Sequence, residues 1–129
     1  MKNTENKINP SSLTDHVYRP LVYICSPYSG DTEANTARAR RFCRFALEHG
    51  QIPLAPHLLF PQFVDDDDAD ERSLALFMDK VLLGKCDELW VLGDEISRGM
   101  KAEIAVAERR NQKIRYFSND FEEVTSERT

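Results

Sequence analysis

The sequence lacks the features that mark membrane, secreted and metal-binding proteins. No hydrophobic run approaches the roughly 20 residues of a membrane span, and residues 1–9 are polar, without the apolar segment of a secretory signal. The cysteines Cys25, Cys43 and Cys86 are odd in number and lack the paired spacing of a zinc site. We therefore expect reduced thiols in a cytoplasmic protein, with no membrane partner, no metal and no cofactor.

Glycine is also scarce, with five residues in 129, and none forms the pattern of a Walker or dinucleotide-binding loop. The acidic run Asp65–Asp68 lacks the glycine and glutamate of a calcium loop, so we interpret it as a solvated loop. A net charge of -5 argues weakly against a nucleic-acid partner. The one basic cluster is interpreted as a solvated helix face; it consists of Arg38, Arg40, Arg41 and Arg44.

What the sequence does contain is a regular alternation of short apolar runs and amphipathic stretches. A hydrophobic content of 41% and a charged content of 30% fit one folded domain. The apolar runs predict strands at residues 21–25, 52–55, 88–92 and 113–117. The amphipathic stretches predict helices at residues 33–49, 72–83 and 97–111. Residues 56–71 are expected to be irregular.

The flanking segments and the helix stripes complete this outline. We expect a flexible N-terminal tail at residues 1–19, a domain at 20–118, and a C-terminal tail at 119–129 that frays or adds a short helix. The apolar stripe of the first helix consists of Asn35, Ala39, Phe42 and Ala46. That of the second helix consists of Leu74, Phe77, Met78, Val81 and Leu82. These positions are expected to face the core.

Alternating strands and helices predict an α/β fold, because parallel strands require crossover connections. Right-handed crossovers then give a three-layer, doubly wound sheet of the flavodoxin or Rossmann type, with four to five parallel strands. We expect residues 21–25 and 88–92 to be adjacent central strands. An antiparallel sheet would contradict the site proposed next.

In such sheets, ligands bind beyond the carboxyl ends of the strands. Three segments are expected there: the turn after the first strand, the start of the irregular segment, and the loop before the third helix. Their candidate binding residues are Ser26, Tyr28, Ser29, Gly30, His57, Ser97 and Gly99. The hydroxyls and backbone N–H groups suit a phosphate or a sugar. An ordinary turn and a plain helix N-cap are equally compatible with these residues, and for a lone histidine such as His57 a structural role is the more common one.

Glu103 is the most informative residue of the chain. It follows Ser97, a natural N-cap, and lies three positions after Met100 and four before Ala107, on or beside the inward stripe. A carboxylate there costs free energy unless it is paired or used. An ionised, half-buried carboxylate above a strand end is typical of a nucleophile or a ligand anchor. Asp79 lies among apolar helix positions, and the sequence leaves open whether it faces solvent.

Two segments resemble the nucleoside 2-deoxyribosyltransferase superfamily. Residues 22–29, Val-Tyr-Ile-Cys-Ser-Pro-Tyr-Ser, resemble its opening strand and turn. Ser97-x-Gly99-x-x-x-Glu103 resembles its nucleophile helix, in the form found in the 2'-deoxynucleoside 5'-phosphate N-hydrolase branch. Asp79 stands eight residues before Asp87, as does that branch's catalytic aspartate. Residues 55–57 and 86–90 look more like the corresponding segments of a group of short, uncharacterised relatives associated with phages and bacteria.

The resemblance implies a mechanism and a substrate class. Glu103 would attack C1' of a deoxyribosyl ring, Tyr23 would hydrogen-bond and orient Glu103, and Asp79 would protonate the leaving base. Ser97 and Ser29 would contact a 5'-phosphate, so the expected partner is a nucleoside or nucleotide. The family also implies a homodimer or a higher homo-oligomer, with sites completed by a neighbouring subunit.

Two departures separate this chain from the family pattern. The transferase branch carries an aspartate near the position of Ser97, and the hydrolase branch carries an arginine near Ser29. Arg98 or Lys101 would have to replace that arginine. A rival interpretation is a non-catalytic module that binds a nucleotide or a nucleotide-derived signal, with Glu103 holding ribose hydroxyls. A structural role for Glu103, paired with an arginine, is a third.

Overall fold

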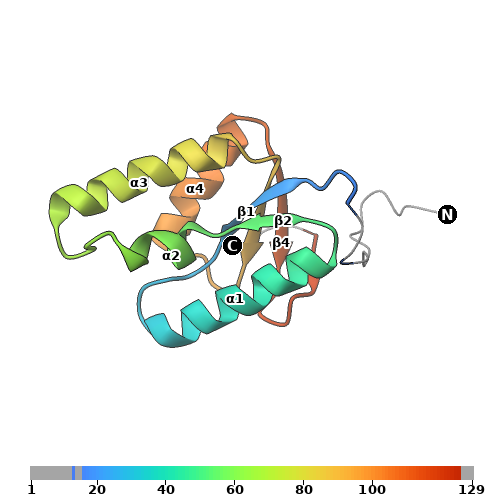
Figure 1. Ribbon diagram of the computed structural model, residues 1–129, viewed down its shortest axis with the longest axis horizontal. Coiled ribbons are helices and arrows are strands. Elements are labelled where there is room, and N and C mark those ends of the chain that lie inside the picture. Colours follow the sequence, from blue (N-terminus) through green and yellow to red (C-terminus); the bar gives the residue numbers. More distant parts are fainter. Residues whose placement is uncertain (1–12, 14–15, 126–129) are drawn as a thin grey trace.

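The computed structural model describes residues 13 and 16–125 as an α/β sandwich (Figure 1). Its elements in chain order are β1 Leu21–Cys25, α1 Thr32–Glu48, β2 Ile52–Leu54, α2 Pro56–Leu59, the 3₁₀ turn η2 Phe60–Gln62, α3 Ala69–Gly84, β3 Glu88–Leu92, α4 Arg98–Arg109, β4 Lys113–Phe117 and β5 Glu123–Val124. Within these residues, no helix is long and apolar enough to cross a bilayer.

The sheet has the strand order β2-β1-β3-β4-β5. The first four strands run parallel, and β5 is antiparallel to β4. Strands β1 and β3 are adjacent, with Tyr23 opposite Leu89, as the sequence predicted. Connections from these two neighbours leave toward opposite faces of the sheet, which places the crevice of a doubly wound fold between them. The predicted fold class is confirmed.

Helix α1 covers one face of the sheet with an aromatic core. Asp31 caps α1 by accepting a hydrogen bond from the Ala34 backbone N–H at 3.2 Å. The predicted positions Ala39, Phe42 and Ala46 are buried, and Asn35 at the end of the stripe is half-buried. The Phe42 ring is fully buried against the rings of Trp90, Phe117 and Phe121, with centroids 5.1–6.0 Å apart.

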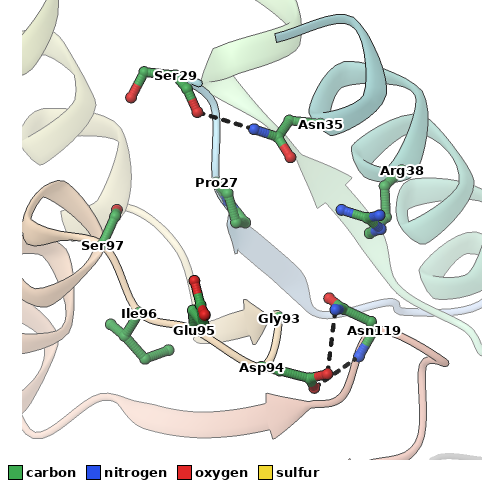
Figure 2. A pocket seen from close by; sticks show the side chains of 10 residues that line it. All are labelled: Pro27, Ser29, Asn35, Arg38, Gly93, Asp94, Glu95, Ile96, Ser97 and Asn119. Carbon is green, nitrogen blue, oxygen red and sulfur yellow. Dashed lines mark hydrogen bonds between the residues drawn. The ribbon is translucent and has the colours of Figure 1, made fainter. Parts of the chain in front are cut away.

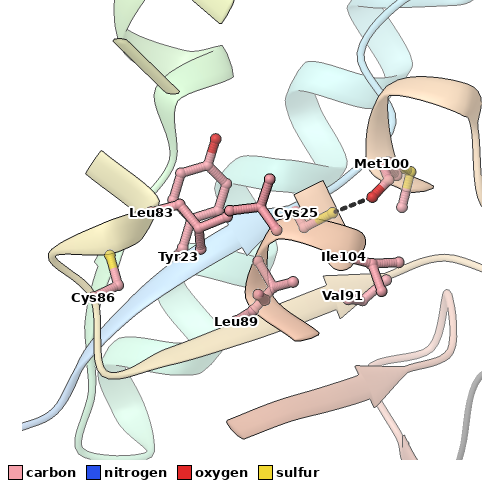
Figure 3. Close-up of a cluster of buried hydrophobic side chains, with 10 residues drawn as sticks. Tyr23, Cys25, Leu83, Cys86, Leu89, Val91, Met100 and Ile104 are labelled. Atoms are coloured by element: carbon pink, nitrogen blue, oxygen red, sulfur yellow. Dashed lines mark hydrogen bonds between the residues drawn. The ribbon is translucent and has the colours of Figure 1, made fainter. Parts of the chain in front are cut away.

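Helices α3 and α4 cover the other face (Figure 3). The buried cluster there takes its members from β1, β3, both helices and the loop between α3 and β3: Tyr23, Cys25, Leu83, Cys86, Leu89, Val91, Met100, Ile104, Val106 and Ala107. Alternate residues of β1 face the two layers, because successive strand side chains point to opposite sides. Tyr23 and Cys25 therefore belong to the α3–α4 side, and Val22 and Ile24 belong to the aromatic side.

The orientation expected for the second helix is wrong. Leu74, Phe77 and Val81 are 54%, 63% and 42% exposed, whereas Asp79 and Leu83 are buried. On a helix, position 79 lies on the side opposite 74, 77 and 81. The apolar stripe therefore faces solvent and Asp79 faces the core, which is the reverse of what periodicity alone predicts. Met78 and Leu82 lie at the margins, half-buried.

Two expected irregular segments also contain regular structure. Residues 56–62 form α2 and η2, and α3 begins at Ala69, three residues earlier than predicted. The Asp68 side chain explains the early start, because it accepts hydrogen bonds from the Asp70 and Glu71 backbone N–H groups at 2.9 and 3.0 Å. The rest of the acidic run is exposed, as expected.

The expected C-terminal helix is absent from the described residues, which place strand β5 there instead. Buried Arg115 on β4 donates to Glu123 on β5 at 2.8 Å and to Glu88 on β3 at 3.2 Å. One guanidinium thus ties three neighbouring strands. Because a buried cation needs paired carboxylates, these ion pairs favour the observed arrangement of β3, β4 and β5.

The aromatic core gives a test of the α1 packing. Phe42→Ala is expected to lower the free energy of unfolding by about 3–5 kcal/mol, since it opens a cavity at a fully buried ring. Arg40→Ala, at an exposed position on the same helix, is the control and should change it by less than about 0.5 kcal/mol. Urea unfolding followed by circular dichroism measures both; similar losses in the two variants would contradict the packing.

Candidate functional site

A hydrogen bond between β1 and α4 forms the centre of the candidate site. The Tyr23 hydroxyl donates to Glu103 Oε2 at 2.6 Å. Tyr23 is 1% exposed and Glu103 is half-buried. A phenol that donates to a carboxylate at this distance forms a short, charge-assisted hydrogen bond. The hydrogen bond that the family resemblance implied between these two residues is therefore present.

Local sequence explains why Glu103 reaches this position. Ser97 is the N-cap of α4, and its hydroxyl accepts a hydrogen bond from the Met100 backbone N–H at 3.3 Å. Met100, Ile104 and Ala107 are buried against the sheet, which orients the helix. Glu103 lies beside this apolar stripe in the N-terminal half of α4, so its side chain is directed toward the sheet and half-buried.

Asp79 contributes a second carboxyl group from α3. It is 5% exposed, and its Oδ1 atom has no hydrogen-bond partner among the residues that the structure describes. Burial raises the pKa of Asp79 to about 7, and the nearby charges of Glu103 and Asp66 add to the shift. The uncertainty left by the sequence is thus resolved: Asp79 faces inward, within electrostatic range of Glu103.

The two carboxyl groups have different hydrogen-bond environments. Burial raises the pKa of Glu103, but the hydrogen bond from Tyr23 opposes that shift by stabilising the carboxylate. The Oδ1 atom of Asp79 has no such donor among the described residues. The arrangement therefore favours an ionised Glu103 beside a protonated Asp79 near neutral pH.

A stacked aromatic pair joins the β1–α1 loop to α2. The rings of Tyr28 and His57 lie 5.1 Å apart at an angle of 21°. The Asn35 side chain fixes the same loop by donating to the carbonyl oxygens of Tyr28 and Ser29 at 3.2 and 3.0 Å. Burial lowers the pKa of His57, an effect that the charge of Asp66 partly opposes, so the stacked imidazole is favoured in its neutral form.

A pocket of about 490 Å³ opens at the carboxyl ends of β1 and β3 (Figure 2). Its wall is polar, with side chains from the β1–α1 loop, α1, the β3–α4 loop and the β4–β5 loop. The lining residues are Pro27, Ser29, Asn35, Arg38, Gly93, Asp94, Glu95, Ile96, Ser97 and Asn119. This is the strand edge at which the sequence predicted a binding site.

Seven of the ten predicted site residues fall into three groups. Tyr23, Asp79 and Glu103 form the buried cluster, and Tyr28 and His57 form the stack. Ser29 and Ser97 line the pocket, and Ser97 also caps the helix that carries Glu103. The remaining three line neither cluster nor pocket: Ser26 is buried after β1, Gly30 has a positive φ of 94°, and a side chain at Gly99 would enter open space.

Arg38 is the main residue that the sequence interpretation missed. The basic cluster was expected to form a solvated helix face, and Arg40, Arg41 and Arg44 are exposed as expected. Arg38 is half-buried, however, and lines the pocket. The suggested substitutes for the absent loop arginine, Arg98 and Lys101, are exposed and do not line this pocket.

Asp94, Glu95 and Asn119 are further pocket residues that the sequence did not single out. Asp94 accepts two hydrogen bonds from Asn119, from its backbone N–H at 3.3 Å and from its side chain at 3.2 Å. Gly93 has a φ of +121°, and a side chain there would contact Asn119 and Pro27. No cluster of three metal-ligating side chains occurs among residues 13 and 16–125.

The buried Asp79 carboxyl predicts a pH-dependent stability difference. In the folded protein its pKa of about 7 lies above the ordinary value of 3.8. Its contribution to stability is therefore full below about pH 4 and is lost as the pH rises toward 7. The Asp79→Asn variant has no carboxyl group at this position and should not lose stability over this pH range. Its free energy of unfolding, relative to the native protein, should rise across that window by on the order of 2–4 kcal/mol.

Urea titrations of both proteins from acidic to mildly alkaline pH measure this difference. Asp70→Asn, at an exposed position of the same helix, is the matched control and should show a flat difference. A flat difference for Asp79→Asn as well would mean that the carboxyl is solvated in the folded protein.

Comparisons with known proteins agree with this architecture. No curated protein matches the chain in sequence. Among solved structures, the chain is similar to a 2-deoxyribosyltransferase from the psychrotolerant bacterium Bacillus psychrosaccharolyticus, with a TM-score of 0.60, 17% sequence identity, and coverage of 81% of this chain and 77% of that chain. At this identity the likeness establishes a shared fold. Residues 20–117 match the family described as a domain of unknown function, and the chain belongs to this family, DUF7768.

Proposed function

We propose that this protein cleaves the N-glycosidic bond of a (deoxy)nucleoside or nucleotide through a covalent glycosyl intermediate on Glu103. The observation that carries the proposal is the buried cluster in which Tyr23 donates to Glu103 and Asp79 lies within electrostatic range. The structurally similar Bacillus protein is a 2-deoxyribosyltransferase, described as a biocatalyst for nucleoside synthesis. Its fold supports the substrate class, and the roles of the residues are inferred from their chemistry.

In the first step, a Glu103 carboxylate oxygen attacks C1' of the sugar. A C–O bond forms as the C1'–N bond breaks, and the bonding electron pair leaves with the base. Asp79 donates its proton to the base nitrogen, so the base departs neutral. Tyr23 orients the attacking oxygen through its hydrogen bond and helps to keep it ionised.

The second step releases the sugar. A water molecule attacks C1', Asp79 as a carboxylate takes the water proton, and the bond to Glu103 breaks. Both side chains then return to their starting protonation states. If a second base replaces the water, the same sequence gives transfer instead of hydrolysis.

The expected protonation states suit the roles proposed for Asp79 as the acid and Glu103 as the nucleophile. An acid whose pKa is about 7 holds a proton at neutral pH and still releases it readily to a leaving group. A nucleophile must be ionised, and the Tyr23 hydrogen bond favours that form of Glu103. Because the two carboxyl groups interact, their pKa values belong to the pair, and activity should follow a bell-shaped pH profile.

The polar pocket is the proposed position of the sugar and its 5' substituent. Ser97 lines the pocket and is also the N-cap of α4, the helix that carries Glu103, so the pocket lies at the start of that helix. Arg38 is the cation of the pocket, and a guanidinium suits a phosphate through bidentate hydrogen bonds. Asn35 and Ser29 supply neutral polar groups beside it.

Removing the nucleophile is the primary test. Glu103→Ala should abolish the release of base, with a loss of several orders of magnitude in rate, because the double displacement needs a carboxylate. Glu103→Gln should also lose turnover while keeping the shape of the site, so substrate should still raise its melting temperature. The assay incubates the protein with a panel of deoxynucleosides, deoxynucleotides and dinucleotides, and free base is measured by chromatography.

Glu108→Gln, at an exposed position on the same helix, is the matched control and should retain full activity. An active Glu103→Ala variant would remove Glu103 from the nucleophile role. A native protein that binds a nucleotide but releases no base from any compound of the panel would favour the non-catalytic binding module.

Arg38 gives a test of the phosphate requirement. Arg38→Gln should raise KM for a 5'-monophosphate by about 10-fold or more, since a hydrogen bond to a charged group contributes about 1.5–3 kcal/mol. KM for the corresponding nucleoside should change by less than about twofold, because no phosphate is present to contact the guanidinium. Arg40→Gln, exposed on the same helix, is the control. Equal changes for both substrates would place the phosphate elsewhere.

A further inference from the structure

The positive charge of this acidic chain is concentrated on helix α1. Residues 34–47 contain four basic residues and no acidic one. All four are arginines: Arg38, Arg40, Arg41 and Arg44. Because they contribute +4 to a net charge of -5, the rest of the chain carries -9. The net charge, which argued weakly against a nucleic-acid partner, is thus an average over an asymmetric distribution, and basic residues gathered along one helix are typical of a protein that binds an anionic partner.

The four side chains occupy neighbouring positions on the surface of α1. Arg41 and Arg44 follow Arg38 at successive spacings of three residues, and Arg40 lies four residues before Arg44. The opposite side of the helix packs against the sheet through Phe42, so Arg40, Arg41 and Arg44 are exposed. In Figure 1, α1 lies along one edge of the molecule. We refer to the four arginines as the arginine face.

Most of the charge of the arginine face is not neutralised by other side chains. Its one ion pair among the residues that the structure describes joins Arg44 to Glu48 at 2.9 Å. Both of these side chains are about half exposed, so the pair contributes little to stability. Arg38, Arg40 and Arg41 form no ion pair with any described residue. Three guanidinium groups are therefore available to an external anion.

Arg38 connects the arginine face to the pocket. It is half-buried and lines the pocket from α1, whereas Asp94 and Glu95 line it from the β3–α4 loop (Figure 2). The two acids repel a phosphate and Arg38 attracts it, so a nucleotide in the pocket is oriented with its 5'-phosphate toward α1. In a polynucleotide, this phosphate is also the link to the preceding nucleotide. The strand on the 5' side therefore leaves the pocket at α1.

We propose that the arginine face binds a single-stranded polynucleotide whose 3'-terminal nucleotide occupies the pocket. This inference rests on the proposed function, because it names the substrate of the same site. Arg38 contacts the 5'-phosphate of the terminal nucleotide, and Arg41 and Arg44 contact phosphates farther toward the 5' end. Attack by water in the second step then leaves a sugar without a base at the 3' end of the strand.

The dimensions of the arginine face and of the pocket suit such a strand. From Arg38 to Arg44 the helix rises by about 9 Å, which at about 3.4 Å per phosphate of a stacked strand covers about two to three phosphates. The planar guanidinium groups match phosphate oxygens through paired hydrogen bonds. The pocket of about 490 Å³ has the size of a small-molecule site and takes one nucleotide unit. A single strand offers its terminal nucleotide without the cost of unpairing a duplex.

Fluorescence anisotropy on the full chain tests the arginine face without depending on catalysis. The probe is a single-stranded oligonucleotide of about ten nucleotides, labelled at its 5' end, in a deoxyribo and a ribo form. Arg41→Gln/Arg44→Gln should weaken the binding of at least one form by about 10-fold or more, since two charge-assisted contacts are lost. The slope of log affinity against log salt should become shallower by about 1.4, because each phosphate contact contributes about 0.7.

Arg109→Gln/Lys113→Gln is the matched control, because it removes the same charge from exposed positions on α4 and β4. Its affinity should stay within about twofold of the native value, since neither position lies on the arginine face. Equal weakening in the two double variants would overturn the proposal. So would a native protein that binds neither oligonucleotide, and binding to phosphatidylserine vesicles alone would assign the arginine face to a membrane surface instead.

Base release tests whether the bound strand is the substrate. In the native protein, kcat/KM for an oligonucleotide with a labelled 3'-terminal base should exceed that for the mononucleotide by about 10-fold or more. Arg41→Gln/Arg44→Gln should lose this advantage and keep the mononucleotide value within about twofold. Base release from mononucleotides without oligonucleotide binding would overturn this inference and leave the proposed reaction intact. Oligonucleotide binding without base release from any substrate would overturn the reaction and leave the arginine face as a polynucleotide-binding surface.

Discussion

The site is organised by the burial of two carboxyl groups between one strand and two helices. Burial in a medium of low polarity disfavours the charged form of each, and two negative charges side by side disfavour it further. The Tyr23 hydroxyl resolves this conflict in one direction, since it stabilises the charge on Glu103 and offers nothing to Asp79. The preference for a charged Glu103 over a charged Asp79 thus depends on a single hydrogen bond of 2.6 Å.

That hydrogen bond depends in turn on the architecture. Tyr23 faces the α3–α4 side because it lies at an odd position of β1, and β1 is buried on both faces as a central strand. Glu103 approaches it because Ser97 begins α4 directly after the loop that follows β3, the neighbour of β1. Any change in strand order would separate the two residues. The polar pocket lies at the carboxyl ends of the same two strands, and its wall is formed by the loops that follow them and by α1.

The sequence predicted those parts of the structure that depend on local patterns. Strands 21–25, 88–92 and 113–117 have the predicted bounds, because an uninterrupted apolar run has few alternatives in an α/β chain. The Tyr23–Glu103 contact was anticipated from family resemblance. Helix α3 was misoriented because periodicity identifies an apolar stripe without identifying what covers it. The stripe of Leu74, Phe77 and Val81 faces solvent in the single chain, and a polar residue, Asp79, faces inward.

The residues that the sequence analysis did not identify share a different property: the side chains around them come from segments that are distant in the sequence. Arg38 resembles its exposed neighbours in sequence, and only the loops around Glu95 and Asn119 turn its position into a pocket wall. Similarly, β5 forms because Glu123 pairs with Arg115 across the sheet edge. No local sequence pattern indicates the pocket position of Arg38 or the ion pair between Glu123 and Arg115. Long-range electrostatic partners are therefore the information that a single sequence does not reveal.

The cost of burying Asp79 bears on the choice between an enzyme and a binding module. A protein that only holds ribose hydroxyls needs one acceptor, and a second buried carboxyl without a hydrogen-bond donor would lower its stability with no gain in affinity. An acid catalyst, in contrast, requires a group that remains protonated at neutral pH, and burial beside another carboxylate is the means by which a protein obtains one. The inward position of Asp79, which the apolar pattern of α3 gave no reason to expect, is therefore more consistent with catalysis than with binding alone.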